Sequence, residues 1–540
     1  MLYNLEEIVL VGVDFAYILI TRYHLLNVGK KIRGAAPLAG KSSATFKVLY
    51  NDKVGRYMVA NKELEAGEEI ITEMPFIVGP KAFTYPLCLS CYTAWPPTLN
   101  EKPLCSKCGW PVCSTECENQ PQHKDYECQI FAQAKEKFNV AAALEQTNEN
   151  GVPQLECITP LRLLLESEKS PERWNNEVKD MEAHNKIRSQ KEHWKSDQVN
   201  VVEYIRNQLK LTRFSEEQIQ TACGILEINT FEIRTAKGFS ARALYPTVAL
   251  MNHSCVSNTC HSISPTDYRI RLRTTIKISP GAELYGSYTH SLLPTMLRRE
   301  HLLEGKHFAC ACPRCSDPTE LGTHMSSLKC NKCDNGIVLS LDSLDLDSSW
   351  KCTHCEFTTS GPAVRKVLRI IQAEVDAVEA ISGADGADAI QERETVIKKY
   401  RSVLHPQHAF WTMLRHSLTQ MYGRVEGYLL DDLPDVVLEH KIDMCRLLLQ
   451  VLDVIEPGYS RIRGMTLYEL HAPLLFIAKT QWNYGTIDEA ALKSKMIDAA
   501  NILKESATIL SLEPPDTPEG QIGIVAKESL TQLEQSINDL

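Results

Sequence analysis

The sequence has little that predicts a membrane or secretory protein. Its mostly apolar stretch near the start, Ile8 to Ile20, carries Asp14 and is too short to span a bilayer, which takes about 20 residues. The start of the chain also lacks the basic segment and the small-residue cleavage site of a signal peptide. We therefore expect this stretch to form a buried strand or helix, or an extra N-terminal segment, rather than an anchor.

The sequence also has fewer basic residues than acidic ones. Lysine and arginine total 58 against 68 acidic residues, which gives a formal net charge of −10. Nucleic-acid binding relies on neutralising phosphates, so this balance argues against nucleic acid as the main partner and disfavours a DNA-binding zinc finger. An acidic surface suits a lysine-rich protein partner.

Cysteine, by contrast, is plentiful, with 19 residues in the chain. Seven cysteines and one histidine fall between positions 88 and 128, in pairs separated by two to four residues. Eight such ligands suit two tetrahedral zinc ions, and a segment with few large apolar residues needs metal to organise it. The alternative, a disulfide framework, is typical of small secreted domains and is disfavoured here. The predicted ligands of this finger are Cys88, Cys91, Cys105, Cys108, Cys113, Cys117, His123 and Cys128.

Two further cysteine groups lie later in the chain. Cys330, Cys333, Cys352 and Cys355 have the spacing of a zinc ribbon. The group Cys310, Cys312 and Cys315 lacks a fourth ligand, and Cys255 completes it across 55 residues. Metal-type spacing implies a reducing compartment, cytosol or nucleus. The remaining cysteines, Cys157, Cys223, Cys260 and Cys445, are expected to be buried thiols.

The pattern of the rest of the chain is mixed. Residues 46–80 and 243–290 are rich in short strand signals, whereas 129–235 are helical and heavily charged, which by default indicates solvated helix faces. From 361 onward apolar residues recur at helical spacing and predict a bundle of helical hairpins, with no firm 34-residue repeat.

Two short strings carry the chemistry. The string from Asn252 to Asn258 (Asn-His-Ser-Cys-Val-Ser-Asn) is rich in small hydrogen-bonding groups around Cys255, and Gly281 to Tyr288 predicts a strand that ends in an aromatic hydroxyl. With the finger, these strings resemble those of the SET-and-MYND (SMYD-type) protein-lysine methyltransferases. The extra ribbon and the string from Val54 to Tyr57 resemble the arthropod-specific branch of that family.

The resemblance implies an α+β, multi-domain fold: a small twisted β-sheet SET core with an inserted MYND zinc finger and helical insert, a post-SET zinc site, a zinc-ribbon insert and a C-terminal, tetratricopeptide-like α-helical bundle. In the finger it implies that the two zinc ions interleave, with Cys88, Cys91, Cys113 and Cys117 on one ion and the other four ligands on the second. The implied boundaries are an N-terminal extension at 1–45, SET segments at 46–87 and 229–320, the finger at 88–128, the helical insert at 129–228, the ribbon at 325–360 and the helical domain at 361–540.

The resemblance also implies the site. Tyr288 is the implied catalytic residue, and S-adenosylmethionine and about four zinc ions are the implied cofactors. The implied partners are a lysine-containing protein substrate such as a histone tail and proline-containing peptides at the finger, in the nucleus, the cytoplasm or both. The implied cofactor-binding residues are Val54, Gly55, Arg56, Asn229, Asn252, His253, Tyr288 and Phe308.

Four positions depart from the family pattern: Tyr57 replaces a glycine, Ser257 a proline, Ala282 a glutamate and Lys306 a tyrosine of the lysine tunnel. Either Lys306 points to solvent or the tunnel is altered. Two functions therefore stay open, an active protein-lysine methyltransferase and a weak or inactive scaffold that acts as a transcriptional co-repressor or adaptor.

Overall fold

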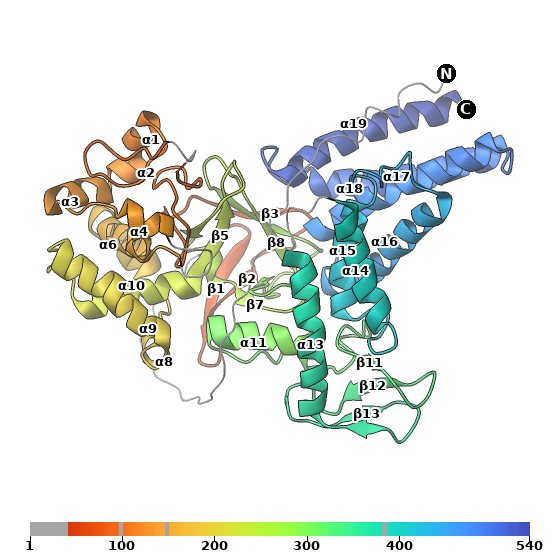
Figure 1. Cartoon of the computed structure of the whole chain (residues 1–540), viewed down its shortest axis with the longest axis horizontal. Helices are drawn as coiled ribbons and strands as arrows, with labels where there is room; N and C mark the ends of the chain where they lie inside the picture. The colour runs from red at the N-terminus through yellow and green to blue at the C-terminus, as the bar shows by residue number, and fades with distance from the viewer. Residues whose placement is uncertain (1–41, 97–100, 146–150, 381–385) are drawn as a thin grey trace.

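A computed structural model of the chain describes residues 42–96, 101–145, 151–380 and 386–540 (Figure 1). The apolar stretch from Ile8 to Ile20 and most of the expected N-terminal extension lie outside the described residues. Among the helices that are described, none combines the length and the apolar character that a membrane crossing needs.

The described chain begins with a β-hairpin. Strand β1 (Phe46–Asn51) pairs antiparallel with β2 (Gly55–Ala60), as their strand-forming residues predict. The turn needs Gly55, whose φ of 76° lies in the left-handed region that favours glycine. The inward residues Phe46, Val48 and Met58 are buried and join the largest apolar core of the molecule.

Two three-stranded sheets beside this hairpin are each built from two distant parts of the sequence. Strand β3 (Glu69–Glu73) pairs with β9 (Ile270–Thr274), which pairs with β8 (Thr259–Ile263). Strand β4 (Ile77–Gly79) pairs with β6 (Ser240–Leu244), which pairs with β5 (Thr230–Arg234). These antiparallel pairings bring residues 69–79 beside residues 230–274, so the residues between them are an insertion in one core of strands.

The insertion occupies one side of the molecule in Figure 1. Its last helix ends at Asn229 and the strand β5 begins at the next residue, so the helical pattern predicted over 129–235 ends six residues early. The finger and insert contain the helices α1 (Thr115–Asn119), α2 (Pro121–Lys124), α3 (Glu127–Ala134), α4 (Val140–Glu145), α5 (Pro153–Glu156), α6 (Ile158–Lys169), α7 (Pro171–Arg173), α8 (Asn185–Arg188), α9 (Glu192–Asp197) and α10 (Glu216–Asn229), with π-helical segments at Trp174–Val178 and Gln198–Gln208.

After the core come two short strands and two helices that frame the candidate site. Strand β7 (Asn252–His253) pairs in parallel with β10 (Tyr285–Gly286), and they are followed by α11 (Thr295–Lys306) and α12 (Pro313–Ser316). The parallel pairing aligns Asn252 with Tyr285 and brings the two chemistry-bearing strings side by side.

The remainder of the chain is a small sheet followed by helices. The antiparallel ribbon consists of β11 (Leu328–Lys329), β12 (Ile337–Ser340), β13 (Trp350–Cys352) and β14 (Thr358–Thr359). The described residues that follow form the helices α13 (Gly361–Ala380), α14 (Ala387–Tyr400), α15 (Ala409–Met421), α16 (Asp435–Ile455), α17 (Arg461–Asn483), α18 (Glu489–Leu510) and α19 (Pro518–Asp539).

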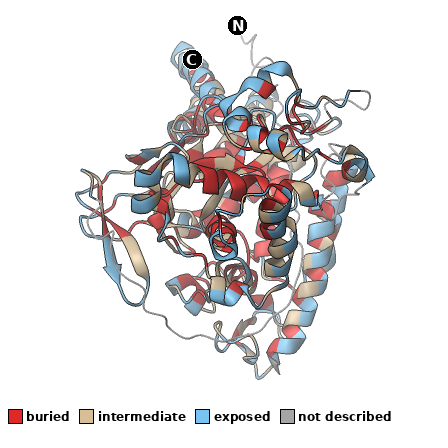
Figure 2. Ribbon diagram, turned by 90° about the vertical axis from the view of Figure 1, so that its left-hand side faces the viewer, coloured by how far each residue is buried: buried red, intermediate tan, exposed pale blue. Residues whose placement is uncertain are grey.

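The C-terminal helical region contacts the central strands through charged side chains, of which Arg273 and Glu513 are buried. Arg273 of β9 donates to the Glu513 carboxylate at 2.7 Å, and Arg461 of α17 donates to the His261 carbonyl at 2.8 Å. Buried residues concentrate on the central strands and on the inner faces of the helices, whose outer faces are exposed (Figure 2). The predicted α+β, multi-domain fold class is confirmed.

Candidate functional site

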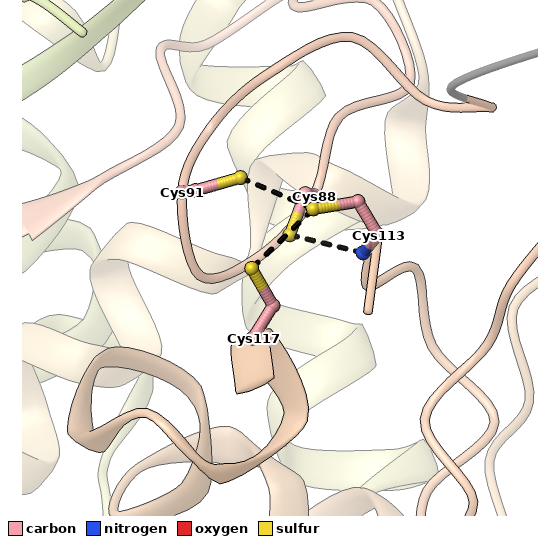
Figure 3. A group of neighbouring side chains, drawn as sticks. All are labelled: Cys88, Cys91, Cys113 and Cys117. Carbon is pink, nitrogen blue, oxygen red and sulfur yellow. Dashed lines mark hydrogen bonds between the residues drawn. The ribbon is translucent and has the colours of Figure 1, made fainter. Parts of the chain in front are cut away.

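The first cysteine group of the finger gathers Cys88, Cys91, Cys113 and Cys117. Figure 3 shows the four thiols pointing toward one another. The Cys113 sulfur lies 3.4 Å from that of Cys91 and 3.3 Å from that of Cys117. Ser114 caps the helix α1 and thereby fixes the position of Cys117 in its first turn. Tetrahedral zinc with bonds of about 2.3 Å holds sulfurs about 3.8 Å apart, so the donor set fits a zinc ion.

The second group is interleaved with the first and is fully buried. The sulfurs of Cys105 and Cys128 lie 3.6 Å apart, and Cys108 lies 3.5 Å from His123 Nε2. All 19 cysteines are free thiols, so the disulfide alternative is not what the structure forms. The pairing of ligands between the two groups is the interleaved one that the family resemblance implies.

A buried ion pair behind His123 was not anticipated from the sequence. His123 Nδ1 lies 2.8 Å from a Glu127 oxygen, and Arg162 of α6 donates to both Glu127 oxygens at 2.6 and 2.8 Å. Arg162 also donates to the Tyr92 hydroxyl and to the Leu89 carbonyl. A carboxylate behind a ligating histidine orients the ring and raises its basicity. His123 lies in the last turn of α2 and Glu127 begins α3, so their separation of four residues in the sequence is the only local signal of this contact.

The third group joins the loop after β7 to the segment after α11. Cys255 lies 3.9 Å from Cys310 and 3.5 Å from Cys315, and Cys312 completes the set. These distances also fit a tetrahedral zinc ion. The predicted long-range fourth ligand is therefore placed where the three-cysteine group needs it.

A second buried charge network, also missed from the sequence, supports this group. Glu320 accepts from Arg298 and Arg314 at 2.8 Å each. Arg298 also contacts the Cys315 sulfur at 3.6 Å, and Arg314 donates to the Cys255 carbonyl at 3.2 Å. Arg298, Arg314 and Glu320 thus contact both of the segments that contribute cysteines to the third group.

The pH dependence of this network is predictable. Burial raises the pKa of the Glu320 carboxyl, but Arg298 and Arg314 outweigh burial and lower it from 4.5 to about 2. A depressed carboxyl pKa stabilises the fold above pH 4.5, and this contribution is lost as pH falls toward about 2. We expect Glu320→Gln to cost on the order of 3 kcal/mol at neutral pH, with the deficit shrinking below pH 4.5 in denaturant titrations. Exposed Glu356→Gln is the control, and a deficit that is constant with pH would contradict the assignment.

The fourth group is in the ribbon. Cys330 lies 3.6 Å from Cys355, and Cys333 lies 3.7 Å from Cys352. A Cβ on Gly336 would come within 2.2 Å of the Cys352 sulfur and 2.6 Å of the Cys333 sulfur. The glycine therefore leaves the space that four sulfurs around an ion require.

Metal content tests all four groups together. We expect about four zinc ions per chain: two in the finger, one at Cys255 and one in the ribbon. Elemental analysis of the purified chain measures this number directly. One or two ions per chain would show that some of the groups are not ligand sets.

Next to the third group lies a triangle of rings. The ring centroids of His253 and Tyr288 are 5.3 Å apart, and Phe308 lies 5.9 Å from His253 and 6.4 Å from Tyr288. The Tyr288 backbone N–H donates to His253 Nδ1 at 3.0 Å, which leaves the proton on Nε2, 3.2 Å from the Cys255 sulfur. The structure thus brings these three predicted site residues together beside the cysteine group.

Tyr288 is 40% exposed as a residue, and its hydroxyl is the end that turns back toward the protein. It donates to the Met251 carbonyl, and burial raises the pKa of Tyr288 to about 12. The phenol is therefore protonated at neutral pH and acts as a hydrogen-bond donor. It follows the short strand β10 by two residues, so the predicted strand from Gly281 is shorter than expected.

Asn252 is oriented by a residue that the sequence reading did not select. Its side-chain amide donates to Glu283 at 2.9 Å, and the same carboxylate accepts from the Tyr285 hydroxyl at 2.8 Å. Glu283 therefore fixes which way the Asn252 amide faces.

The other predicted cofactor residues lie along the helical insert and the hairpin. Arg56 donates to the Asp180 carbonyl and Asn229 to the Glu182 carbonyl, each at 2.9 Å, so both side chains are engaged by one loop of the insert. Val54 is exposed at the hairpin turn. The space beside Gly55 at the turn is open, because a Cβ there would meet no atom within 4 Å.

Lys306 points inward. Its ammonium group donates to the Ile228 carbonyl at 2.6 Å and lies 5.8 Å from the centre of the Tyr288 ring. Of the two alternatives read from the sequence, solvent exposure is therefore wrong, and a lysine lies beside the implied catalytic tyrosine. Among the leftover cysteines, Cys260 is partly exposed rather than buried, because it lies at the junction with the helical domain near Tyr459.

Comparison with known proteins agrees with this arrangement. The SET domain family profile matches residues 55–289. The fly (Drosophila melanogaster) SET domain-containing protein SmydA-8, isoform B, is 30% identical over 315 residues, which cover 56% of this chain and 64% of that protein. Human (Homo sapiens) N-lysine methyltransferase SMYD2 is 26% identical over 267 residues, which cover 45% of this chain and 56% of that protein. The matches thus span less than two thirds of these relatives.

Among solved structures, the SET domain of LSMT bound to lysine and AdoHcy aligns over 79% of this chain and 88% of that chain, with 11% identity and a TM-score of 0.30. That overall similarity is too low to support any inference. The profile match, the fly and vertebrate relatives, the split core and the cysteine groups agree with one another. The matched profile covers less than half of the chain, and together these findings make the chain similar to SMYD-type SET-domain proteins, with the fly protein SmydA-8 among its relatives.

Proposed function

We propose that the chain is an S-adenosylmethionine-dependent protein-lysine N-methyltransferase. The observation that carries this proposal is the Tyr288 hydroxyl beside the rings of His253 and Phe308, at the cysteine group that ties two distant segments together. The SET-domain match and relatives named as N-lysine methyltransferases support the same reaction class.

The residues present suit such a cofactor. The ring faces of His253 and Phe308 fit an adenine base, and the oriented amide of Asn252 offers hydrogen bonds to polar groups. When bound, S-adenosylmethionine supplies a methyl group activated by a sulfonium. The chain contributes positioning. The Tyr288 phenol, held by its hydrogen bond to the Met251 carbonyl, would present its oxygen to the acceptor amine, and Cys255, which lies beside Cys310, would keep Phe308 in place.

The proposed zinc ligands are the four groups described above. In the finger they would stabilise a protein-binding module, and in the third group they would clamp the segment after α11 over the cofactor. We propose histone or non-histone proteins as substrates, proline-containing peptides as partners of the finger, and a role in transcriptional regulation in the nucleus, the cytoplasm or both. The net charge of −10 supports basic protein partners.

A second candidate function is supported by Lys306. A positive charge next to the transfer point disfavours an incoming lysine ammonium, which suits a scaffold with weak or absent turnover. Such a chain would act as an adaptor or co-repressor through its finger.

Methyl transfer from labelled cofactor to a protein and peptide array separates the two functions. We expect transfer by the full chain and its loss in Tyr288→Phe. Tyr484→Phe is the control, since Tyr484 is 80% exposed at the end of α17. Cofactor binding without transfer to any array member would favour the adaptor.

A further inference from the structure

Lys306 brings a cationic side chain to the implied transfer point. It ends the helix α11, and the next residue, His307, has a left-handed φ of 61° that turns the chain toward Phe308. The Ile228 carbonyl holds the Lys306 ammonium at 2.6 Å, and the ammonium lies 5.8 Å from the Tyr288 ring centre. The amine is therefore anchored, and it lies beside the same ring that an acceptor amine must approach.

The groups around Lys306 act on its charge in opposite directions. Burial lowers the pKa of Lys306, and the Glu227 carboxylate offsets this in part. Glu227 is shared, because it accepts from Arg188 Nε at 2.7 Å and lies 3.8 Å from His307. The face of the Tyr288 ring and the Ile228 carbonyl both favour the charged ammonium.

We propose that Lys306 is a specificity-determining residue: its ammonium group excludes protonated amines from the side of Tyr288, so that an acceptor lysine is held there only in its neutral form. This inference rests on the proposed methyltransferase function and adds a selection step to it. The neutral form is the reactive one, because its lone pair forms the nitrogen–carbon bond while the carbon–sulfur bond breaks. The sulfur leaves with the electron pair as a thioether, and the methylated ammonium then gives a proton to water.

The size of the effect follows from Coulomb's law. Two unit charges about 6 Å apart in a partly buried site repel enough to weaken binding roughly a hundredfold, and solvent screening reduces this to about tenfold. A neutral side chain of the same shape feels none of this repulsion. The ratio of the two affinities therefore measures the charge of Lys306.

The test uses the full chain saturated with S-adenosylhomocysteine and two small probes, lysine and norleucine, each capped as the N-acetyl N-methylamide. Ligand-detected NMR gives the affinity of both at pH 7. We expect Lys306→Met to bind the lysine probe at least about tenfold more tightly relative to the norleucine probe than the unmodified chain does. Lys306→Arg keeps the charge and should keep the original ratio, and exposed Lys237→Met is the matched control.

Three results would overturn the inference: an unchanged ratio in Lys306→Met, failure of norleucine to bind either form, or a methyl group found on Lys306 itself by mass spectrometry after incubation with S-adenosylmethionine. Where the array provides a substrate, Lys306→Met should also lower KM at pH 7 and move the acid limb of kcat to higher pH. If the full chain transfers no methyl group to the array but Lys306→Met still alters the probe ratio, the proposed function is rejected and the charge selection stands. The two failures are therefore distinguishable.

Discussion

Replacement of Arg162 by methionine is expected to lower the free energy of unfolding by about 3–5 kcal/mol and to release zinc from the second finger group. Arg162 is fully buried and makes two hydrogen bonds to Glu127, which in turn contacts His123. Methionine leaves the Glu127 carboxylate buried without its cation and leaves the Leu89 carbonyl without a donor.

Denaturant unfolding followed by tryptophan fluorescence, together with zinc release to a colorimetric chelator, measures both effects. Trp110 stacks on Phe131 at 4.0 Å between ring centroids and reports on the finger. The control is Arg213→Met, because the Arg213–Glu168 pair is exposed and such pairs contribute less than about 1 kcal/mol. Equal small effects of the two substitutions would show that the buried pair does not support the finger.

The cysteine groups are predictable because metal ligation imposes short spacings that survive as a sequence pattern. Two residues between Cys88 and Cys91, or between Cys330 and Cys333, suffice to place both sulfurs in one group. Cys255 is predictable as the fourth ligand although it lies 55 residues before Cys310, because the three later cysteines leave one position of a tetrahedral ligand set open. The strands β1 and β2 were predictable for a similar reason, since their strand-forming residues and glycine turn are local signals.

The buried charges were not predictable, because nothing local distinguishes them from solvated ones. Arg162 and Arg298 lie on helices whose charged residues are by default solvent-facing, yet both are buried by segments that are remote or irregular in sequence. Their partners Glu127 and Glu320 are 35 and 22 residues away. The direction of the Lys306 side chain is likewise not predictable from the local sequence. The end of α11 allows this side chain to point to solvent or inward, and its contact with Ile228 of α10 turns it inward.

Two cysteines only five positions apart in the sequence have different surroundings. Cys255 lies in the third group and contacts His253, whereas Cys260 of β8 contacts only the neighbouring carbonyl of Tyr459 and the guanidinium of Arg273 among its described hydrogen-bond partners. Removing a ligand should therefore disturb the site, and removing the other thiol should not.

We expect Cys255→Ser to lose one zinc ion per chain and to weaken binding of S-adenosylhomocysteine by at least about tenfold. Loss of a residue that only supports a metal ligand lowers metal affinity or activity by about 10–100-fold, and loss of the ligand itself should lower it at least as much. Cys260→Ser should retain all the zinc and bind with unchanged affinity. Elemental analysis and calorimetric titration of the two variants give both numbers. Equal losses in the two variants would mean that residues 310–315 are not tied to the loop after β7 by metal, and the proposed clamp over the cofactor would fail with it. A loss confined to Cys255→Ser would instead show that the zinc ion supports the ring triangle of His253, Tyr288 and Phe308. His253 contacts both the Cys255 sulfur and the other two rings, so it would transmit this support.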